Sequence, residues 1–314
     1  MTRSGLYEVF MSTLPLRGSF VALITPFDRK KRIDRKVLEE LVEWHIKEGT
    51  DGIVCCGTTG EGLALSEAER KKVTEICIHT AQKRIPIIAS TGTSDTRQSV
   101  KLTEHMYKLG ADGCLVVTPY YNKPSQRGCI LHFGEITRVG LPMIIYHNPG
   151  RAVIRLTAEA IAEIAEFPSV VAIKESSHDM DLVKKIRKLS KIPLFSGEDD
   201  LTYAILGEGG IGAISVIGNI IPRGWSEMIH LALEGKWTPA KLLADRYAPL
   251  CKALFLETNP QCVKFAMHWL GLAEGALRLP LIPPEMPIQK EIQRTLVSLS
   301  LPQFLKVDLR NYYI

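Results

Sequence analysis

The sequence lacks any long hydrophobic run. Glycine, proline or charge interrupts every apolar stretch of the 314-residue chain within about ten positions, whereas a membrane span needs roughly 18 to 20. The first residues, MTRSGLYEVFMSTLPLRG, contain no apolar signal core and no small-residue cleavage site. We therefore expect a cytoplasmic protein with no membrane partner, a disordered leader over residues 1–17, and Met11 as a second candidate start.

Cysteine and histidine spacings that are typical of metal sites are also missing. The seven cysteines include no C-x-x-C pair, which favours a reducing compartment, and no H-x-H or H-E-x-x-H spacing occurs. We expect no metal and no other cofactor. Four side chains that follow predicted strands nevertheless keep a metal-dependent aldolase open as an alternative. They are His147, Glu175, His178 and Asp199.

The chain has only a small excess of positive over negative charge. The formal net charge is +5, and the one dense basic cluster, residues 29–32, follows a Pro-Phe-Asp turn with no aromatic residues interleaved. We interpret this cluster as a solvated loop and expect no nucleic-acid partner.

Short apolar runs alternate with amphipathic stretches from residue 18 onward. The runs are apolar almost throughout, which indicates strands buried on both faces, as in a parallel sheet. The predicted strands are 20–24, 52–56, 85–89, 113–117, 143–146, 170–173, 193–195 and 212–216. The predicted helices that follow them are 35–49, 66–83, 96–109, 125–138, 157–166, 180–190, 200–207 and 222–235.

Eight such units predict an α/β fold, a single (β/α)8 TIM barrel over residues 18–235. A doubly wound sheet is disfavoured because no G-x-G-x-x-G follows the first strand, and the glycine-rich run 207–212 precedes its strand instead. The later pattern is purely helical. It predicts a C-terminal helical extension over residues 236–300, with helices at 239–257, 261–270 and 286–299, and a tail over 301–314.

The active site of such a barrel lies at the carboxyl ends of its strands. Lys174 ends an apolar run, where burial would favour a free amine that can attack a carbonyl and form a Schiff base. Tyr146 ends the neighbouring run and could shuttle protons. Thr58 and Thr59 lie among glycines whose amides can hold a small carboxylate. Arg151, in a Pro-Gly-Arg loop, suits bidentate carboxylate recognition.

Each of these residues also has a structural alternative. Lys174 could pair with Glu198 or Asp199 across the rim of the barrel. Tyr146 could be a packing tyrosine, the threonines could belong to a simple turn, and Arg151 could form a surface salt bridge. Together, however, they describe a site for a small oxo acid, with an amine for its ketone, amides for its carboxylate, a phenol for protons and a guanidinium for a second acid.

Motifs along the chain resemble those of a known family. In order and spacing they are similar to the dihydrodipicolinate synthase / N-acetylneuraminate lyase family of class I aldolases, over about residues 18–300. The motifs are GTTGE (57–61), TPYYNKPSQ (118–126), IIYHNPGR (144–151), IKES (173–176), SGEDD (196–200), AISVIGN (213–219) and NPQCVKFAM (259–267).

The resemblance implies a role for each matched residue. Lys174 would form the Schiff base with pyruvate, and Tyr146 would be hydrogen-bonded over it. Thr58 would link that tyrosine to Tyr121, which would reach in from a neighbouring subunit of a homotetramer built as a dimer of dimers. Thr59, together with Thr58, would bind the pyruvate carboxylate.

The resemblance also bears on the second substrate. Gly197 and Ile214 would line the pocket through their backbones, and Arg151 matches the arginine by which the family's synthases bind L-aspartate 4-semialdehyde on the route to diaminopimelate and lysine. Two departures from the usual pattern are present, since Ala152-Val153 replaces Thr-Gly and His147 replaces Asn. The alternatives are a pyruvate-dependent aldolase or lyase acting on a sugar acid, N-acetylneuraminate or 2-keto-3-deoxy-gluconate, and a ligand-binding regulator that retains the barrel.

Overall fold

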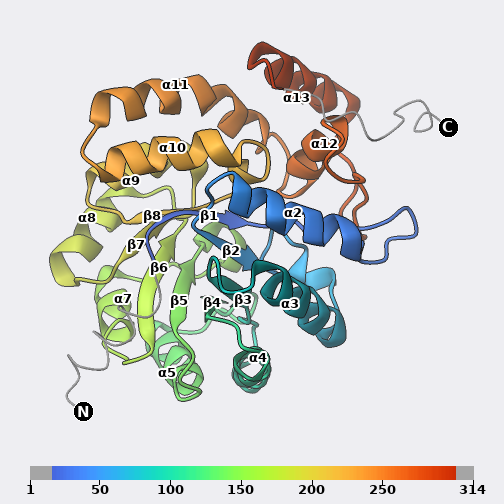
Figure 1. Cartoon of the computed structure of the whole chain (residues 1–314). Coiled ribbons are helices and arrows are strands. Elements are labelled where there is room, and N and C mark those ends of the chain that lie inside the picture. Colours follow the sequence, from blue (N-terminus) through green and yellow to red (C-terminus); the bar gives the residue numbers. More distant parts are fainter. Residues whose placement is uncertain (1–15, 302–314) are drawn as a thin grey trace.

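Eight parallel strands close into one barrel, with β8 hydrogen-bonded to β1 (Figure 1). The computed structural model describes residues 16–301 of the chain, so the predicted tail and most of the predicted leader lie outside the described residues. The predicted (β/α)8 barrel is confirmed. Its strands are β1 (Gly18–Ala22), β2 (Gly52–Cys55), β3 (Ile87–Ser90), β4 (Gly113–Val117), β5 (Met143–His147), β6 (Val170–Glu175), β7 (Leu194–Ser196) and β8 (Gly212–Ser215).

Helices surround the barrel, and several of them begin at residues whose side chains cap them. Ser66 and Glu69 form the predicted capping box. The side chains of Asp34, Asp95 and Ser125 each accept a free backbone amide in the first turn of the helix that follows them. The barrel helices are α2 (Arg35–Lys47), α3 (Glu67–Ala81), α4 (Thr96–Leu109), α5 (Gln126–Thr137), α6 (Pro149–Ala152), α7 (Ala158–Ile164), α8 (Met180–Leu189), α9 (Thr202–Gly207) and α10 (Pro222–Leu233).

Three further helices follow the barrel. They are α11 (Trp237–Ala253), α12 (Gln261–Trp269) and α13 (Met286–Ser298). In Figure 1, α11 lies beside α10, and α13 packs against both α11 and α12. Within residues 16–301, no helix combines the length and the apolar character that crossing a membrane requires.

The structure differs from the predicted bounds by one or two residues at several strands, such as β1, which was predicted at 20–24, and at the carboxyl ends of β5 and β6. Strands β5 and β6 run past their predicted ends, to His147 and Glu175, because these two polar side chains bond to each other across the strands and can therefore be buried. The short helix α6 was not predicted, since a single helical turn leaves no periodic apolar pattern in the sequence.

The barrel interior is an apolar plug beneath the site. Side chains from all eight strands form one buried cluster, within which the Phe20 and Phe195 rings meet edge to face at 5.2 Å. Ile214 is fully buried in this cluster, and Tyr146 is its uppermost member on β5. The larger cluster fills the space between the strands and the helices. Groups at the carboxyl end of the barrel thus rest on a dry interior.

A buried ion pair attaches the C-terminal helices to the loop that follows β2. Lys264 of α12 contacts the Glu61 carboxylate at very short range, donates to the Ala276 carbonyl at 2.9 Å, and lies over the Phe27 ring. Burial lowers the pKa of Lys264 to about 8, against the attraction of Glu61. The Arg278 amide donates to the other Glu61 oxygen at 2.9 Å. This pairing fixes the loop that carries Thr58 and Thr59.

We predict that Lys264→Met destabilises the fold strongly, because it leaves the Glu61 carboxylate buried without its cation. Breaking one side of a buried pair costs about 3–5 kcal/mol. The midpoint of chemical denaturation measures this loss. The matched control is Lys241→Met, which removes an exposed partner of Asp245 on α11 and should leave the midpoint nearly unchanged. Equal midpoints for the two variants would contradict the assigned role of the buried pair.

Candidate active site

Lys174 lies at the open end of the barrel, one residue before the end of β6. The strand register places it between Tyr146 of β5 and Phe195 of β7. Its side chain is only 6% exposed, and Nζ lies 4.4 Å from the centroid of the Tyr146 ring. No carboxylate of residues 16–301 lies within ion-pair distance of Nζ. The amine is therefore buried against an aromatic ring without a counter-ion.

The two acidic residues proposed as alternative partners of Lys174 have other partners. Asp199 accepts hydrogen bonds from the amides of Val216 and Ile217, the latter at 2.7 Å. Burial raises the pKa of Asp199 to about 7, while the donating amide of Ile217 opposes this shift. Burial also raises the pKa of Glu198, although the nearby charges of His178 and Lys174 lower it. The rim therefore offers Lys174 no close ion pair.

Gly197 leaves the space that the lysine side chain occupies. A Cβ atom at this position would lie 2.8 Å from Lys174 Cε and 1.9 Å from Ser176 Oγ. The Gly197 amide also donates to the Glu175 carbonyl at 2.8 Å, which holds the loop close to β6. A side chain at this position would displace the Lys174 side chain, so the close approach of the loop to Lys174 requires glycine.

Asn148 fixes both the tyrosine and the loop that follows it. Its side-chain nitrogen donates to the Tyr146 hydroxyl at 3.0 Å, so the hydroxyl acts as an acceptor there and keeps its own proton for another partner. Its side-chain oxygen accepts the Arg151 amide at 3.0 Å and thereby caps α6. One amide side chain thus orients Tyr146 and starts the turn that carries Arg151.

Asn259 connects the arginine to the threonine loop. The guanidinium of Arg151 donates to the Asn259 carbonyl at 3.0 Å, and the Asn259 side-chain nitrogen donates to Thr59 Oγ1 at 3.0 Å. Asn148 and Asn259 lie inside family motifs but were not among the predicted site residues. An asparagine in a loop has no distinctive pattern in sequence, and only the folded contacts reveal these two.

These groups surround two adjoining cavities. The cavity around the lysine is lined by Thr58, Thr59, Tyr146, Arg151, Lys174 and Gly197, together with Glu198 and Asn259. A larger cavity of about 310 Å³ shares Thr58, Tyr146 and Arg151 with it. The structure therefore brings six of the predicted residues around one small cavity of about 30 Å³, which adjoins the larger one.

Two predicted residues lie elsewhere in the single chain. Ile214 is buried in the barrel interior below the cavities. Tyr121 is 87% exposed and has a φ of +71° in the loop after β4, and it lines neither cavity. The neighbouring Tyr120 lines the larger cavity instead.

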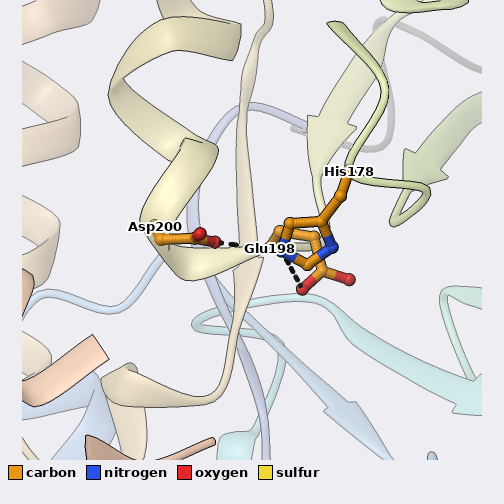
Figure 2. A group of neighbouring side chains, drawn as sticks. All are labelled: His178, Glu198 and Asp200. Carbon is orange, nitrogen blue, oxygen red and sulfur yellow. Dashed lines mark ion pairs between the residues drawn. The ribbon is translucent and has the colours of Figure 1, made fainter. Parts of the chain in front are cut away.

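The four residues of the metal alternative are not gathered into one cluster. His147 and Glu175 bond to each other, and Asp199 binds backbone amides. Figure 2 shows the group that the structure does bring together, in which His178 Nε2 lies 3.5 Å from a Glu198 oxygen and 3.4 Å from an Asp200 oxygen. His178 and Asp200 are more than half exposed, so their mutual attraction accounts for this group at the rim.

Comparisons with known proteins agree with the geometry. The family model described as the dihydrodipicolinate synthetase family matches residues 15–299. A 4-hydroxy-tetrahydrodipicolinate synthase of Thermodesulfovibrio yellowstonii is 43% identical to this chain over 288 residues, which cover 91% of this chain and 99% of that protein. A protein of the same name from Brucella abortus is 41% identical over 285 residues, covering 90% of this chain and 97% of its own length.

Solved structures of similarly named proteins superpose closely on this chain. The dihydrodipicolinate synthase from Aquifex aeolicus has a TM-score of 0.90 at 40% identity and covers 92% of this chain and all of its own. The chloride-inhibited enzyme from Acinetobacter baumannii, solved in complex with pyruvate, has a TM-score of 0.89 at 40% identity. Its alignment covers 91% of this chain and 99% of that one.

We predict that Asn148→Ala lowers stability by about 1 kcal/mol, because it removes the cap of α6 and the donor to Tyr146. Asn148→Asp is the matched control, since an aspartate oxygen can still accept the Arg151 amide. The denaturation midpoints of both variants measure the difference. Equal losses for alanine and aspartate would show that the capping contact does not hold this turn.

Proposed function

The chain belongs to the dihydrodipicolinate synthetase family, and we propose that it acts as a 4-hydroxy-tetrahydrodipicolinate synthase, a lyase that condenses pyruvate with L-aspartate 4-semialdehyde. One observation carries this proposal. An unpaired lysine is buried against Tyr146 in a cavity that Arg151 also lines, which suits an oxo acid bound next to a second acid. The names of the relatives favour this function over cleavage of a sugar acid.

The first half of the proposed reaction joins pyruvate to Lys174. The free amine attacks the keto carbon, and the resulting carbinolamine loses water to give a Schiff base. We assign the proton transfers of both steps to Tyr146, whose ring centroid lies 4.4 Å from the amine and whose hydroxyl accepts from Asn148 rather than donating to it. The Thr58–Thr59 loop would hold the pyruvate carboxylate through its amides and hydroxyls.

The second half forms the carbon–carbon bond. The methyl group of bound pyruvate loses a proton, and the enamine attacks the aldehyde carbon of the semialdehyde, whose oxygen takes up a proton. The amino group of the same substrate then attacks the imine carbon and displaces Lys174, which closes the ring and restores the free amine. Arg151 would bind the carboxylate of the semialdehyde with the donors that it does not give to Asn259.

We further propose that the active assembly is a cytoplasmic homotetramer in which Tyr121 completes the site of a neighbouring subunit. The exposure of the Tyr121 ring supports this, because a large aromatic side chain that is so exposed in the single chain is suited to an interface. Leu63, in the loop after β2, is also 74% exposed. Sedimentation velocity measures the assembly, and a fully active monomer would contradict the shared site.

We predict that Arg151→Ala raises the KM for L-aspartate 4-semialdehyde about 10- to 100-fold, since it removes a charge-assisted hydrogen bond to the carboxylate. The KM for pyruvate should change little. A coupled steady-state assay with both substrates measures each constant.

The matched control is Arg138→Ala, which removes an exposed guanidinium paired with Glu135 outside the site. Unchanged turnover of the semialdehyde by Arg151→Ala would remove the reason for assigning this substrate. Rapid cleavage of N-acetylneuraminate or 2-keto-3-deoxy-gluconate by the wild type, without turnover of the semialdehyde, would favour the sugar-acid alternative.

A further inference from the structure

A second buried pair lies directly behind the two residues that are proposed to form and protonate the Schiff base. The register of β5 and β6 aligns Tyr146 with Lys174 and His147 with Glu175. Successive residues of a strand face opposite sides, so His147 and Glu175 lie on the helical side of the barrel wall. Both are almost fully buried, and His147 Nδ1 lies 2.7 Å from Glu175 Oε2.

Hydrogen bonds fix the tautomer and the orientation of the His147 ring. The Leu156 amide donates to Nε2 at 3.0 Å, so in this arrangement Nε2 is an acceptor and the ring proton lies on Nδ1. Nδ1–H therefore donates to Glu175, whose other oxygen accepts the Ser177 amide at 2.7 Å. Both ring nitrogens and both carboxylate oxygens have partners, which holds the imidazole in a single position.

The ring joins three segments that carry site residues. His147 follows Tyr146 directly, and Glu175 follows Lys174. Leu156 belongs to the segment that returns from α6, the short helix that carries Arg151. An asparagine at this position would end near the location of Nδ1 and would be too short to reach the Leu156 amide. The histidine therefore adds a link between the lysine and tyrosine strands and the arginine loop.

We propose that His147 is a positioning residue with two separable effects on the reaction. The bond from Nδ1 to Glu175 sets Lys174 against Tyr146 and so controls the rate of Schiff-base formation. The bond from Leu156 to Nε2 sets the loop of Arg151 and so controls recognition of the second substrate. This inference rests on the proposed function, because it assigns each bond to one of that reaction's two substrates.

Two substitutions separate the effects. His147→Asn places a donor near the position of Nδ1 and removes the acceptor at Nε2, whereas His147→Gln places an acceptor near the position of Nε2 and removes the donor at Nδ1. The first measurement is the rate at which pyruvate and borohydride trap the protein. The second is the steady-state KM for L-aspartate 4-semialdehyde.

We expect His147→Asn to keep its trapping rate within about twofold and to raise the KM for the semialdehyde about tenfold, the effect of one lost buried hydrogen bond. His147→Gln should be trapped about tenfold or more slowly and keep its KM, since a small misplacement of reacting groups is costly. Glu175→Gln disturbs the same bond from the other side. Glu175→Gln should behave as His147→Gln does, and it provides the test if His147→Gln does not fold.

The matched controls are His79→Asn and His79→Gln, which make the same changes at an exposed histidine of α3. Wild-type protein that pyruvate does not trap would refute the proposed Schiff base itself. If the wild type is trapped, then unchanged constants in all three variants would overturn the positioning role. Equal losses in both constants, following a lowered melting temperature, would also overturn it and assign the pair to stability alone.

Discussion

The candidate active site is arranged around one buried amine, that of Lys174, which has no ion-pair partner among residues 16–301. Lys174 lies at the top of an apolar barrel interior, with the Tyr146 ring beside it. The amine lines the cavity together with Thr58, Thr59 and Arg151, where it can reach the carbonyl group of a substrate. Three features keep this side chain in place: the neighbouring glycine, the register of the strands, and the hydrogen bonds among the residues around the cavity. Gly197 provides its space, and the hydrogen bonds of Asn148 and Asn259 keep its neighbours in position.

A second buried lysine in the same chain shows the contrast. Lys264 has the Glu61 carboxylate, the Ala276 carbonyl and the Phe27 ring around it, so its positive charge is balanced where it lies. Lys174 has an aromatic ring beside it, but no carboxylate of residues 16–301 lies within ion-pair distance of its amine. The paired lysine fastens the C-terminal helices to the threonine loop, whereas Lys174 lines a small cavity that adjoins a larger one of about 310 Å³. The same residue type thus serves structure or chemistry according to its partners.

The sequence predicted the parts of the fold that depend on local patterns. Apolar runs located the strands, and the position of Lys174 after one of them located the amine. The ends of β5 and β6 were missed because His147 and Glu175 are polar, and only their mutual hydrogen bond allows them to remain in buried strands. Asn259 was missed because its partners Arg151 and Thr59 lie 108 and 200 residues away along the chain. Such contacts leave no periodic signal in a sequence.

The central claim is that the unpaired buried amine is the nucleophile, and peptide mapping after reduction tests it most directly. The protein is incubated with pyruvate, reduced with borohydride, digested and analysed by mass spectrometry. We expect a reduced pyruvyl group on the peptide that contains Lys174 and none on the peptide that contains Lys264. An adduct on another lysine would contradict the account. Turnover that a chelator abolishes, with no adduct on any lysine, would also contradict it.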